Sequence, residues 1–265
     1  MGEDGITWYF YALGLSIPRA YFLYEVTIME KFWTQLQENF LFVLCCAGII
    51  ALLAVLAHVA ERFLPATRHT SKAKRLCIIG VCSAIATVLH MLDFPLPFLA
   101  PDFYKLDFSE LPVMLCGFYL GPSAAVACEA VKILLKLLLK GTSTAFVGDF
   151  ANFAVGCSLE LPAAIVYHTK KTRSSALLGL ITGTVCLTAF GSAFNAVYLL
   201  PKFSQLYGLP LDSIIGMGSA INAGITSLQT FVMLAVAPLN LIKGASVSVL
   251  TLLLYKRVAR PLFGK

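Results

Sequence analysis

Long apolar stretches separated by short polar ones constrain the fold of this chain more than any other feature. Hydrophobic residues make up 58% of the 265 residues and charged residues only 13%, whereas a typical soluble domain carries about 25% charged residues. The apolar runs have the length of membrane-crossing helices and exceed that of barrel strands. We therefore predict an all-α integral membrane protein embedded in a lipid bilayer.

The basic residues predict the orientation of these helices. They form three clusters, each beside an apolar run: Arg62, Arg68, Lys72, Lys74 and Arg75; Lys170, Lys171 and Arg173; Lys256, Arg257, Arg260 and Lys265. Loops rich in lysine and arginine stay in the cytoplasm, so we expect the N-terminus outside and the C-terminus inside a bacterial-type cell (plasma) membrane. The net charge of +6 then reflects membrane topology, and no nucleic-acid binding is expected.

The apolar runs divide the chain into four segments. Residues 1–37 mix aromatic and acidic residues with no basic stretch before an apolar run, which predicts an extracytoplasmic aromatic arm and not a signal peptide. Residues 38–74 predict an extra N-terminal transmembrane helix and a basic cytoplasmic linker. Residues 75–260 predict a bundle of six transmembrane helices, and residues 261–265 a cytoplasmic tail.

Glycine and proline residues mark the ends of helices within the six-helix bundle. The segment 110–140 is too long for a single crossing, and we expect Gly121-Pro122 to break it into two helices. A later span at 175–199 is expected to stop at Pro201.

The last apolar stretch, residues 221–255, would measure about 50 Å as one helix, which exceeds the thickness of a bilayer core. We expect Pro238 to divide it. Residues 238–256 are then the membrane span, because a second crossing would place the basic C-terminal cluster outside. The preceding piece becomes a re-entrant or surface-lying helix. One long kinked helix is the alternative.

This topology brings embedded polar residues together near the outer surface. Asp149 and Asn195 lie near the outer ends of two spans, and Asn240 and Lys243 occupy the first turns of the last one. A lysine at bilayer depth costs roughly 2.5–3.5 kcal/mol, so such residues usually have a function. We therefore predict a pocket that is open to the exterior and capped by the aromatic loop at 93–110.

Each of these polar residues also has a structural interpretation. Asn195 can hydrogen-bond a neighbouring backbone carbonyl, and Lys243 can extend to the membrane surface. Asp149 can cap its helix or pair with a lysine of another helix. Glu129 and Lys132, three residues apart on one helix, can neutralise each other.

The cysteines and histidines predict no metal site or catalytic centre. All eight cysteines lie within apolar runs, where cysteine usually packs as a small apolar residue. The chain contains no CxxC pair and no Cys/His cluster with metal-ligand spacing. We expect no metal and no cofactor.

Four sequence motifs resemble a known family. The run Pro101-Asp-Phe-Tyr-Lys-Leu-Asp-Phe-Ser-Glu-Leu-Pro112 resembles the first external loop of substrate-binding (S) components of energy-coupling factor (ECF) vitamin importers. The runs Gly148-Asp-Phe-Ala-Asn152, Asn195-Ala-Val-Tyr-Leu-Leu-Pro201 and Pro238-Leu-Asn-Leu-Ile-Lys-Gly244 resemble the riboflavin-specific branch. The resemblance covers about residues 75–260 and leaves residues 1–74 unassigned.

This resemblance implies a membrane-embedded, high-affinity vitamin-binding subunit whose transported substrate is riboflavin. It implies that asparagine and lysine side chains contact the flavin ring while the first external loop closes over it. Asparagine amides suit the uracil-like edge of the ring, which alternates acceptors and a donor, and lysine can donate to a carbonyl. The expected site residues are Asn195, Asn240, Lys243, Leu99, Pro101, Phe103 and Asp149.

Transport by such a subunit needs partners. The sequence has no GxxxxGK[ST] phosphate loop, so it cannot hydrolyse ATP by that route. The resemblance implies a membrane coupling (T) subunit and two ATPase subunits. Gly80 and Ala84, spaced for close helix approach, predict the docking face. Packing of the same residues within the chain is the alternative.

Three other functions remain open from the sequence. The chain can be an S component for another vitamin such as pantothenate. It can be an intramembrane enzyme that uses Asp149, Glu129 or Glu160, although it lacks paired acid and base groups at motif spacing, a nucleophile signature and metal ligands. It can also be a scaffold whose aromatic N-terminal arm binds another protein.

Overall fold

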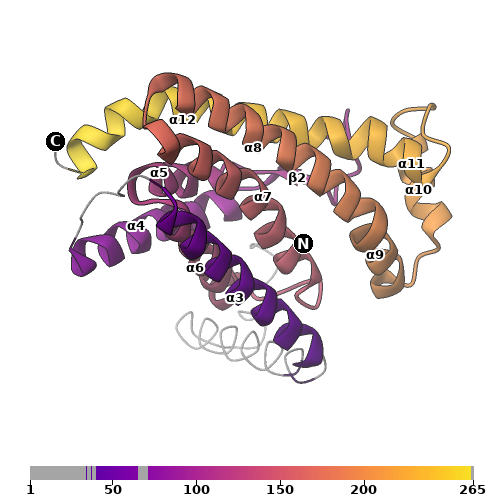
Figure 1. The fold of residues 1–265 in the computed structure, drawn as a ribbon. Coiled ribbons are helices and arrows are strands. Elements are labelled where there is room, and N and C mark those ends of the chain that lie inside the picture. Colours follow the sequence, from indigo (N-terminus) through magenta and orange to yellow (C-terminus); the bar gives the residue numbers. More distant parts are fainter. Residues whose placement is uncertain (1–33, 35–36, 38–39, 65–70, 264–265) are drawn as a thin grey trace, which may run out of the picture.

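The fold is a bundle of long helices, described by a computed structural model for residues 34, 37, 40–64 and 71–263 (Figure 1). The predicted aromatic arm at 1–37 lies outside the described residues except for Thr34 and Gln37. Part of the predicted linker and the last two residues of the predicted tail also lie outside them.

The described residues form helices in chain order, with one pair of two-residue strands. The helices are α3 (Phe40–Arg62), α4 (Lys72–Met91), α5 (Glu110–Leu120), α6 (Pro122–Lys140), α7 (Val147–Lys170), α8 (Arg173–Phe194), η1 (Asn195–Leu199), α9 (Leu200–Tyr207), α10 (Leu211–Ser219), α11 (Leu228–Phe231), η2 (Val232–Val236) and α12 (Ala237–Phe263). The strands β1 (Phe94–Pro95) and β2 (Lys105–Leu106) pair antiparallel.

Five helical stretches among the described residues are long and apolar enough to cross a membrane. They are α3, α4, α7, the stretch Arg173–Tyr207 and the stretch Leu228–Tyr255. This confirms the all-α membrane protein predicted from composition. The predicted count of six helices plus one does not follow from length and apolarity alone, because α5 has only 11 residues and α6 carries Glu129, Lys132, Lys136 and Lys140.

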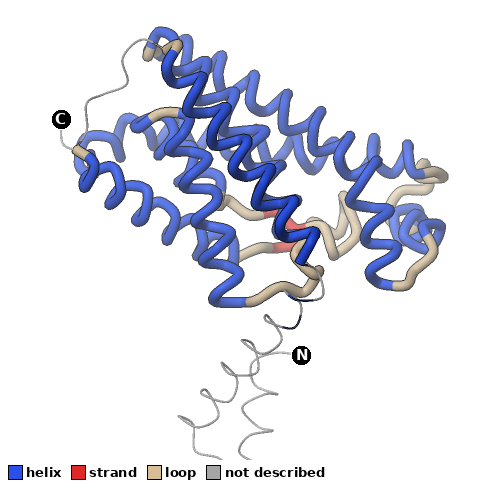
Figure 2. The backbone as a smooth tube through the Cα atoms, turned by 60° about the horizontal axis from the view of Figure 1, so that its bottom comes forward, coloured by secondary structure: helices blue, strands red, loops and turns tan. Residues whose placement is uncertain are grey.

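The predicted break between α5 and α6 is confirmed. Gly121 has a φ of 119°, which favours glycine, and Pro122 begins α6, where its missing N–H costs no hydrogen bond. Because α5 has 11 residues, it is only about 16 Å long, roughly half the hydrocarbon thickness. The loop that precedes α5 fills part of the remaining depth, and its Ala100 and Ser109 are fully buried. Figure 2 shows its strand pair lying among the helices.

Neither Pro201 nor Pro238 ends a helix, which corrects two predictions. Helical structure runs from Arg173 to Tyr207 and from Leu228 into α12. The alternative of one long helix therefore describes the last apolar stretch, and no separate re-entrant helix precedes Pro238.

The same local feature explains both corrections. A π-helical segment ends two residues before each proline: η1 before Pro201 and η2 before Pro238. In an ordinary α-helix a proline ring clashes with the carbonyl four residues earlier, and here that carbonyl belongs to the π-helical segment. The wider π turn, with an i→i+5 bond, accommodates the proline without breaking the helix.

The helices α7, α8 and α12 pack closely through small residues. A Cβ added to Gly179 would lie 2.6 Å from the carbonyl oxygen of Ala163, and one added to Gly191 would lie 2.7 Å from Nδ2 of Asn240. Beside these helices, Phe118 stacks on Tyr167 at a centroid distance of 4.3 Å. This packing fixes the position of α12, and therefore of Asn240 and Lys243.

Candidate ligand pocket

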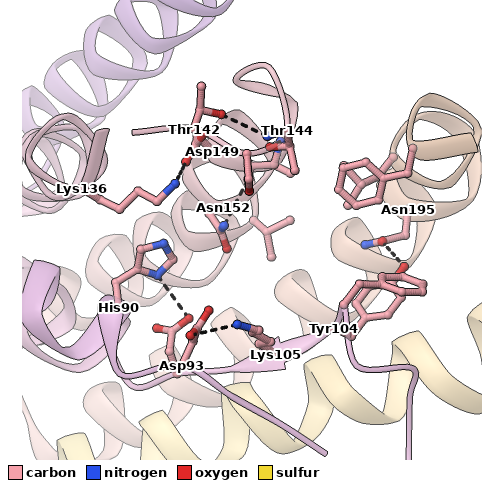
Figure 3. Close-up of a pocket in the computed structure, with 18 of the residues that line it drawn as sticks. His90, Asp93, Tyr104, Lys105, Lys136, Thr142, Thr144, Asp149, Asn152 and Asn195 are labelled. Atoms are coloured by element: carbon pink, nitrogen blue, oxygen red, sulfur yellow. Dashed lines mark hydrogen bonds and ion pairs between the residues drawn. The ribbon is translucent and has the colours of Figure 1, made fainter. Parts of the chain in front are cut away.

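A cavity of about 510 Å³ lies where the α4–α5 loop meets α6, α7, η1, α9 and α12 (Figure 3). We call this end of the bundle the pocket end. Five of the seven predicted site residues line the cavity: Phe103, Asp149, Asn195, Asn240 and Lys243. The cavity thus gathers side chains from three distant helical stretches and the loop, as the sequence predicted.

Leu99 and Pro101 do not line the cavity. Leu99 is partly buried against an apolar cluster that includes Phe231 and Val236, and Pro101 is buried in the loop. In this structure Leu99 packs the loop against α11 and η2. The predicted contact of both residues with a ligand remains a prediction.

Asn240 lines the cavity and carries an unpartnered buried donor. The residue is 8% exposed, and its Nδ2 atom has no hydrogen-bond partner among the described residues. The side chain lies against Gly191, where a Cβ would leave only 2.7 Å to Nδ2. An unsatisfied buried amide costs about 1–3 kcal/mol, so the site favours a ligand that presents an acceptor to it.

Asn195 is held by two hydrogen bonds. Its Nδ2 donates to the backbone carbonyl of Gly191 at 2.7 Å. This confirms the predicted hydrogen bond between Asn195 and a neighbouring backbone carbonyl. Its Oδ1 accepts from the Tyr104 hydroxyl at 2.6 Å, and Figure 3 shows the two side chains pointing toward each other. Burial raises the pKa of Tyr104, so its hydroxyl remains a donor. The sequence did not single out Tyr104 as a site residue, although it lies beside Phe103 in the first external loop.

Lys243 does not extend to the membrane surface. It is 9% exposed, and its Nζ lies 2.8 Å from Oε1 of Glu110 and 3.3 Å from Oδ2 of Asp107. Asp107 in turn lies 3.4 Å from Nδ1 of His90. Burial tends to raise the pKa of Asp107, but the charge of Lys243 and the hydrogen bond with His90 hold that pKa well below its usual range.

A second buried lysine extends these contacts away from the cavity. Nζ of Lys132 lies 2.6 Å from Glu129 and 3.6 Å from Glu110, which confirms the predicted pairing of Glu129 with Lys132. Because Glu110 contacts both lysines, the charges of α5, α6 and α12 form one group. We call Asp107, Glu110, Glu129, Lys132 and Lys243 the ion network.

Two further ion pairs line the cavity. Lys136 lies 2.5 Å from Oδ1 of Asp149, so the predicted pairing of Asp149 with a lysine of another helix is confirmed. Lys105 and Asp93 form a more exposed pair at 3.2 Å. Both pairs are visible in Figure 3. Together with the aromatic rings of Phe103 and Tyr104, they give the cavity polar and apolar walls.

The arrangement suits binding, and the acidic residues considered for catalysis are paired or lie away from the cavity. Asp149 and Glu129 are paired with lysines, and neither Glu129 nor Glu160 lines the cavity. No group of three or more His, Cys, Asp or Glu side chains among the described residues has metal-binding geometry. A cavity with apolar walls and a few oriented polar groups is typical of a small-molecule site.

The predicted docking residues lie on the open face of α4. Gly80 and Ala84 are exposed, and a Cβ added to Gly80 would meet no atom within 4 Å. Their packing within the chain, the alternative considered from sequence, therefore does not occur among the described residues. On the adjoining buried side of α4, Ser83 donates to the backbone of Cys128, and Thr87 to that of Lys132.

Comparisons with known proteins agree with this architecture. The family model described as "ECF transporter, substrate-specific component" matches residues 74–255. The chain is 38% identical over 186 residues to the riboflavin transporter RibU of Staphylococcus aureus (strain TCH60), covering 70% of this chain and 90% of that protein. It is 32% identical over 185 residues to the riboflavin transporter FmnP of Bacillus subtilis (strain 168), covering 69% and 91%.

A solved structure shows the same fold. It is described as "Structure and mechanism of the S component of a bacterial ECF transporter", and it matches with a TM-score of 0.57 and 35% sequence identity. The match covers 74% of this chain and 100% of the other. The helix α3 precedes the residues that the family model matches.

Proposed function

The chain belongs to the family of substrate-specific components of ECF transporters, and on that premise we propose that it binds riboflavin in the 510 Å³ cavity and delivers it for uptake. It is a membrane transporter component and not an enzyme. Two relatives that are more than 30% identical are riboflavin transporters, which favours this vitamin over others such as pantothenate.

The unpartnered amide of Asn240 is the observation that best supports a flavin. The isoalloxazine ring has a uracil-like edge with two carbonyl acceptors and one N–H donor. The free Nδ2 of Asn240 would donate to a carbonyl, and Lys243 lies one helical turn further along the same cavity wall. The aromatic rings of Phe103 and Tyr104 would cover the apolar part of the ring system.

We propose that the pocket end faces the exterior. At the opposite end, α3 ends at Arg62, α4 begins at Lys72, α7 ends at Lys170 and α8 begins at Arg173. These basic residues favour the cytoplasmic side. The cavity would then accept substrate from outside, and the C-terminal end of α12 would lie in the cytoplasm.

Uptake would require a coupling module. The sequence has no phosphate-binding loop of the GxxxxGK[ST] type, so ATP hydrolysis by that route must come from other chains. We propose a membrane coupling subunit and two ATPase subunits as partners. The open face of α4 around Gly80 and Ala84 would accept a closely packed partner helix.

Ligand identification tests the proposed function. The chain purified in detergent from cells supplied with riboflavin should carry a yellow, fluorescent compound with the mass of riboflavin, close to one per chain. Another vitamin in the extracted ligand, with no riboflavin bound on addition, would contradict the proposal. In vesicles, the chain alone should bind riboflavin but accumulate none without the coupling module and ATP.

A further inference from the structure

The helix α3 lies outside the residues matched by the family model, yet one of its faces is packed against the bundle. Residues spaced three or four apart form this face, as expected for one side of a helix. It comprises Phe42, Cys46, Ile50, Leu53, Ala57 and Glu61, whereas Leu44, Leu52, Val55, Leu56 and Val59 on the other side are exposed. Figure 1 shows α3 running along α6.

Polar contacts fix the end of α3 that is remote from the cavity. The carboxylate of Glu61 accepts a hydrogen bond from Ser123 at the start of α6 and lies 3.7 Å from the guanidinium of Arg75 on α4. Arg75 also donates to Ser123 at 2.6 Å. Further along, Ala57 is 0% exposed and packs in an apolar cluster with Phe153 of α7. The helix is therefore attached along most of its length.

The other end of α3 contacts the wall of the cavity. Phe42 meets Phe150 of α7 edge to face at a centroid distance of 6.2 Å, and Phe150 meets Phe194 of α8 at 6.4 Å. Phe42 also packs against the apolar cluster that contains Ala151 and Leu199. Both of these residues line the cavity.

Through these contacts Phe42 connects α7, which carries Asp149, with the α8–η1 stretch, which carries Asn195. Phe150 directly follows Asp149, and Phe194 directly precedes Asn195. Outward movement of either helix would widen the cavity and displace these polar groups. The Phe42 ring contacts Phe150 of α7 and packs on the apolar cluster that contains Leu199 of η1, so it resists this movement.

We infer that α3 supports the binding site of this S component from behind its wall, and that Phe42 is a positioning residue that holds the α7 and η1 wall closed around the ligand. The inference rests on the proposed function, because it concerns retention of the ligand in the same cavity. It gives a role to a helix that the resemblance to the family leaves unassigned.

The dissociation rate of riboflavin tests the inference. Release is followed by the recovery of flavin fluorescence after rapid dilution of the loaded protein in detergent. Phe42→Ala should release riboflavin about tenfold faster, since truncation of a packed phenylalanine side chain is a large perturbation of the wall. Phe42→Leu, which keeps most of the apolar volume, should restore release to within about threefold of the unsubstituted rate.

Phe40→Ala is the matched control, because Phe40 lies on the same helix and is 63% exposed. It should leave the release rate unchanged. An unchanged release rate in Phe42→Ala, in a chain that binds riboflavin, would overturn the inference and leave the proposed function intact. Failure of the unsubstituted chain to bind riboflavin would instead overturn the proposed function and the inference with it.

Two further measurements separate positioning from general stability. The melting temperature of the ligand-free protein should fall alike in Phe42→Ala and in Glu61→Gln, which weakens the polar attachment at the remote end, while only Phe42→Ala releases riboflavin faster. Equal acceleration by both variants would overturn the specific role of Phe42. If Phe42→Ala does not fold, Phe42→Val replaces it with the same criteria.

Discussion

The pocket and the adjoining ion network both place polar groups inside an apolar bundle, but they differ in how those groups are satisfied. In the pocket, Nδ2 of Asn240 has no partner among the described residues. In the ion network, Lys132 lies within 3.6 Å of both Glu110 and Glu129. The comparison shows that a charge buried in the membrane is not by itself a sign of a binding site. What distinguishes the ion network is that its opposite charges pair within the chain; it too contains carboxylate oxygens, Oε2 of Glu110 among them, that accept no hydrogen bond among the described residues.

Lys243 belongs to both regions. It lines the cavity, and it also pairs with Asp107 and Glu110. Its charge is therefore compensated by the protein before any ligand arrives. A neutral ligand such as riboflavin can then accept a hydrogen bond from Lys243 without leaving an uncompensated charge in the apolar interior.

The largest effect is expected from breaking the ion network at Lys132. Lys132→Met removes the lysine partner of Glu129 and one of the two lysine partners of Glu110, and removing one member of a buried ion pair typically costs about 3–5 kcal/mol. The folded fraction and melting temperature in detergent should fall sharply. Lys105→Met is the control for stability, since the Lys105 side chain is 43% exposed and such pairs contribute only about 0–1 kcal/mol. Equal decreases in melting temperature in both variants would contradict the distinction between the regions.

The double role of Lys243 can be separated by a compensating substitution. Lys243→Met should lower both stability and riboflavin affinity, because it leaves Glu110 and Asp107 without this lysine. Lys243→Met combined with Glu110→Gln should recover much of the stability, since replacing both members of a buried pair is often close to neutral. Riboflavin affinity, measured by fluorescence titration, should stay at least about tenfold weaker. Recovery of affinity together with stability would assign Lys243 to the ion network alone.

A smaller effect is expected where the pocket is packed most tightly. Gly191→Ala places a Cβ 2.7 Å from Nδ2 of Asn240, and overpacking of this kind costs about 1–3 kcal/mol. The displaced amide should weaken riboflavin binding by a similar free energy. Gly48→Ala is the matched control, because a Cβ there meets nothing within 4 Å. Unchanged riboflavin affinity in Gly191→Ala would mean that the position of Asn240 does not matter for binding.

The smallest effect is expected at the hydrogen bond that orients Asn195. Tyr104→Phe keeps the ring and removes the donor to Oδ1 of Asn195, which should weaken riboflavin binding by about 0.5–1.5 kcal/mol. The melting temperature should change little. Tighter riboflavin binding in Tyr104→Phe would show that the hydroxyl competes with the ligand for Asn195 and does not position it.

Local and short-range features of this fold could be predicted from the sequence. The helix break at Gly121-Pro122 follows from local backbone chemistry, and the pairing of Glu129 with Lys132 from helical spacing. Membrane topology also placed Asn195 and Asn240 at one end of the bundle, where they line one cavity.

Other features depend on tertiary context. The π-helical segments that let helices continue through Pro201 and Pro238 have no simple sequence signal. The contact of Lys243 with Asp107 joins residues 136 positions apart. This contact forms only because the loop before α5 enters the bundle. The length of α5 does not by itself predict how deeply that loop enters.

A riboflavin titration of the ligand-free protein, comparing the unsubstituted chain with Asn240→Ala, tests most directly whether the unsatisfied donor of the pocket holds the flavin. The unsubstituted chain should quench the fluorescence of about one riboflavin per chain, and Asn240→Ala should bind about 1–3 kcal/mol more weakly with an unchanged melting temperature. Leu241→Ala, at the neighbouring position but 51% exposed, should bind like the unsubstituted chain. Equal riboflavin affinity in Asn240→Ala and Leu241→Ala would contradict this account.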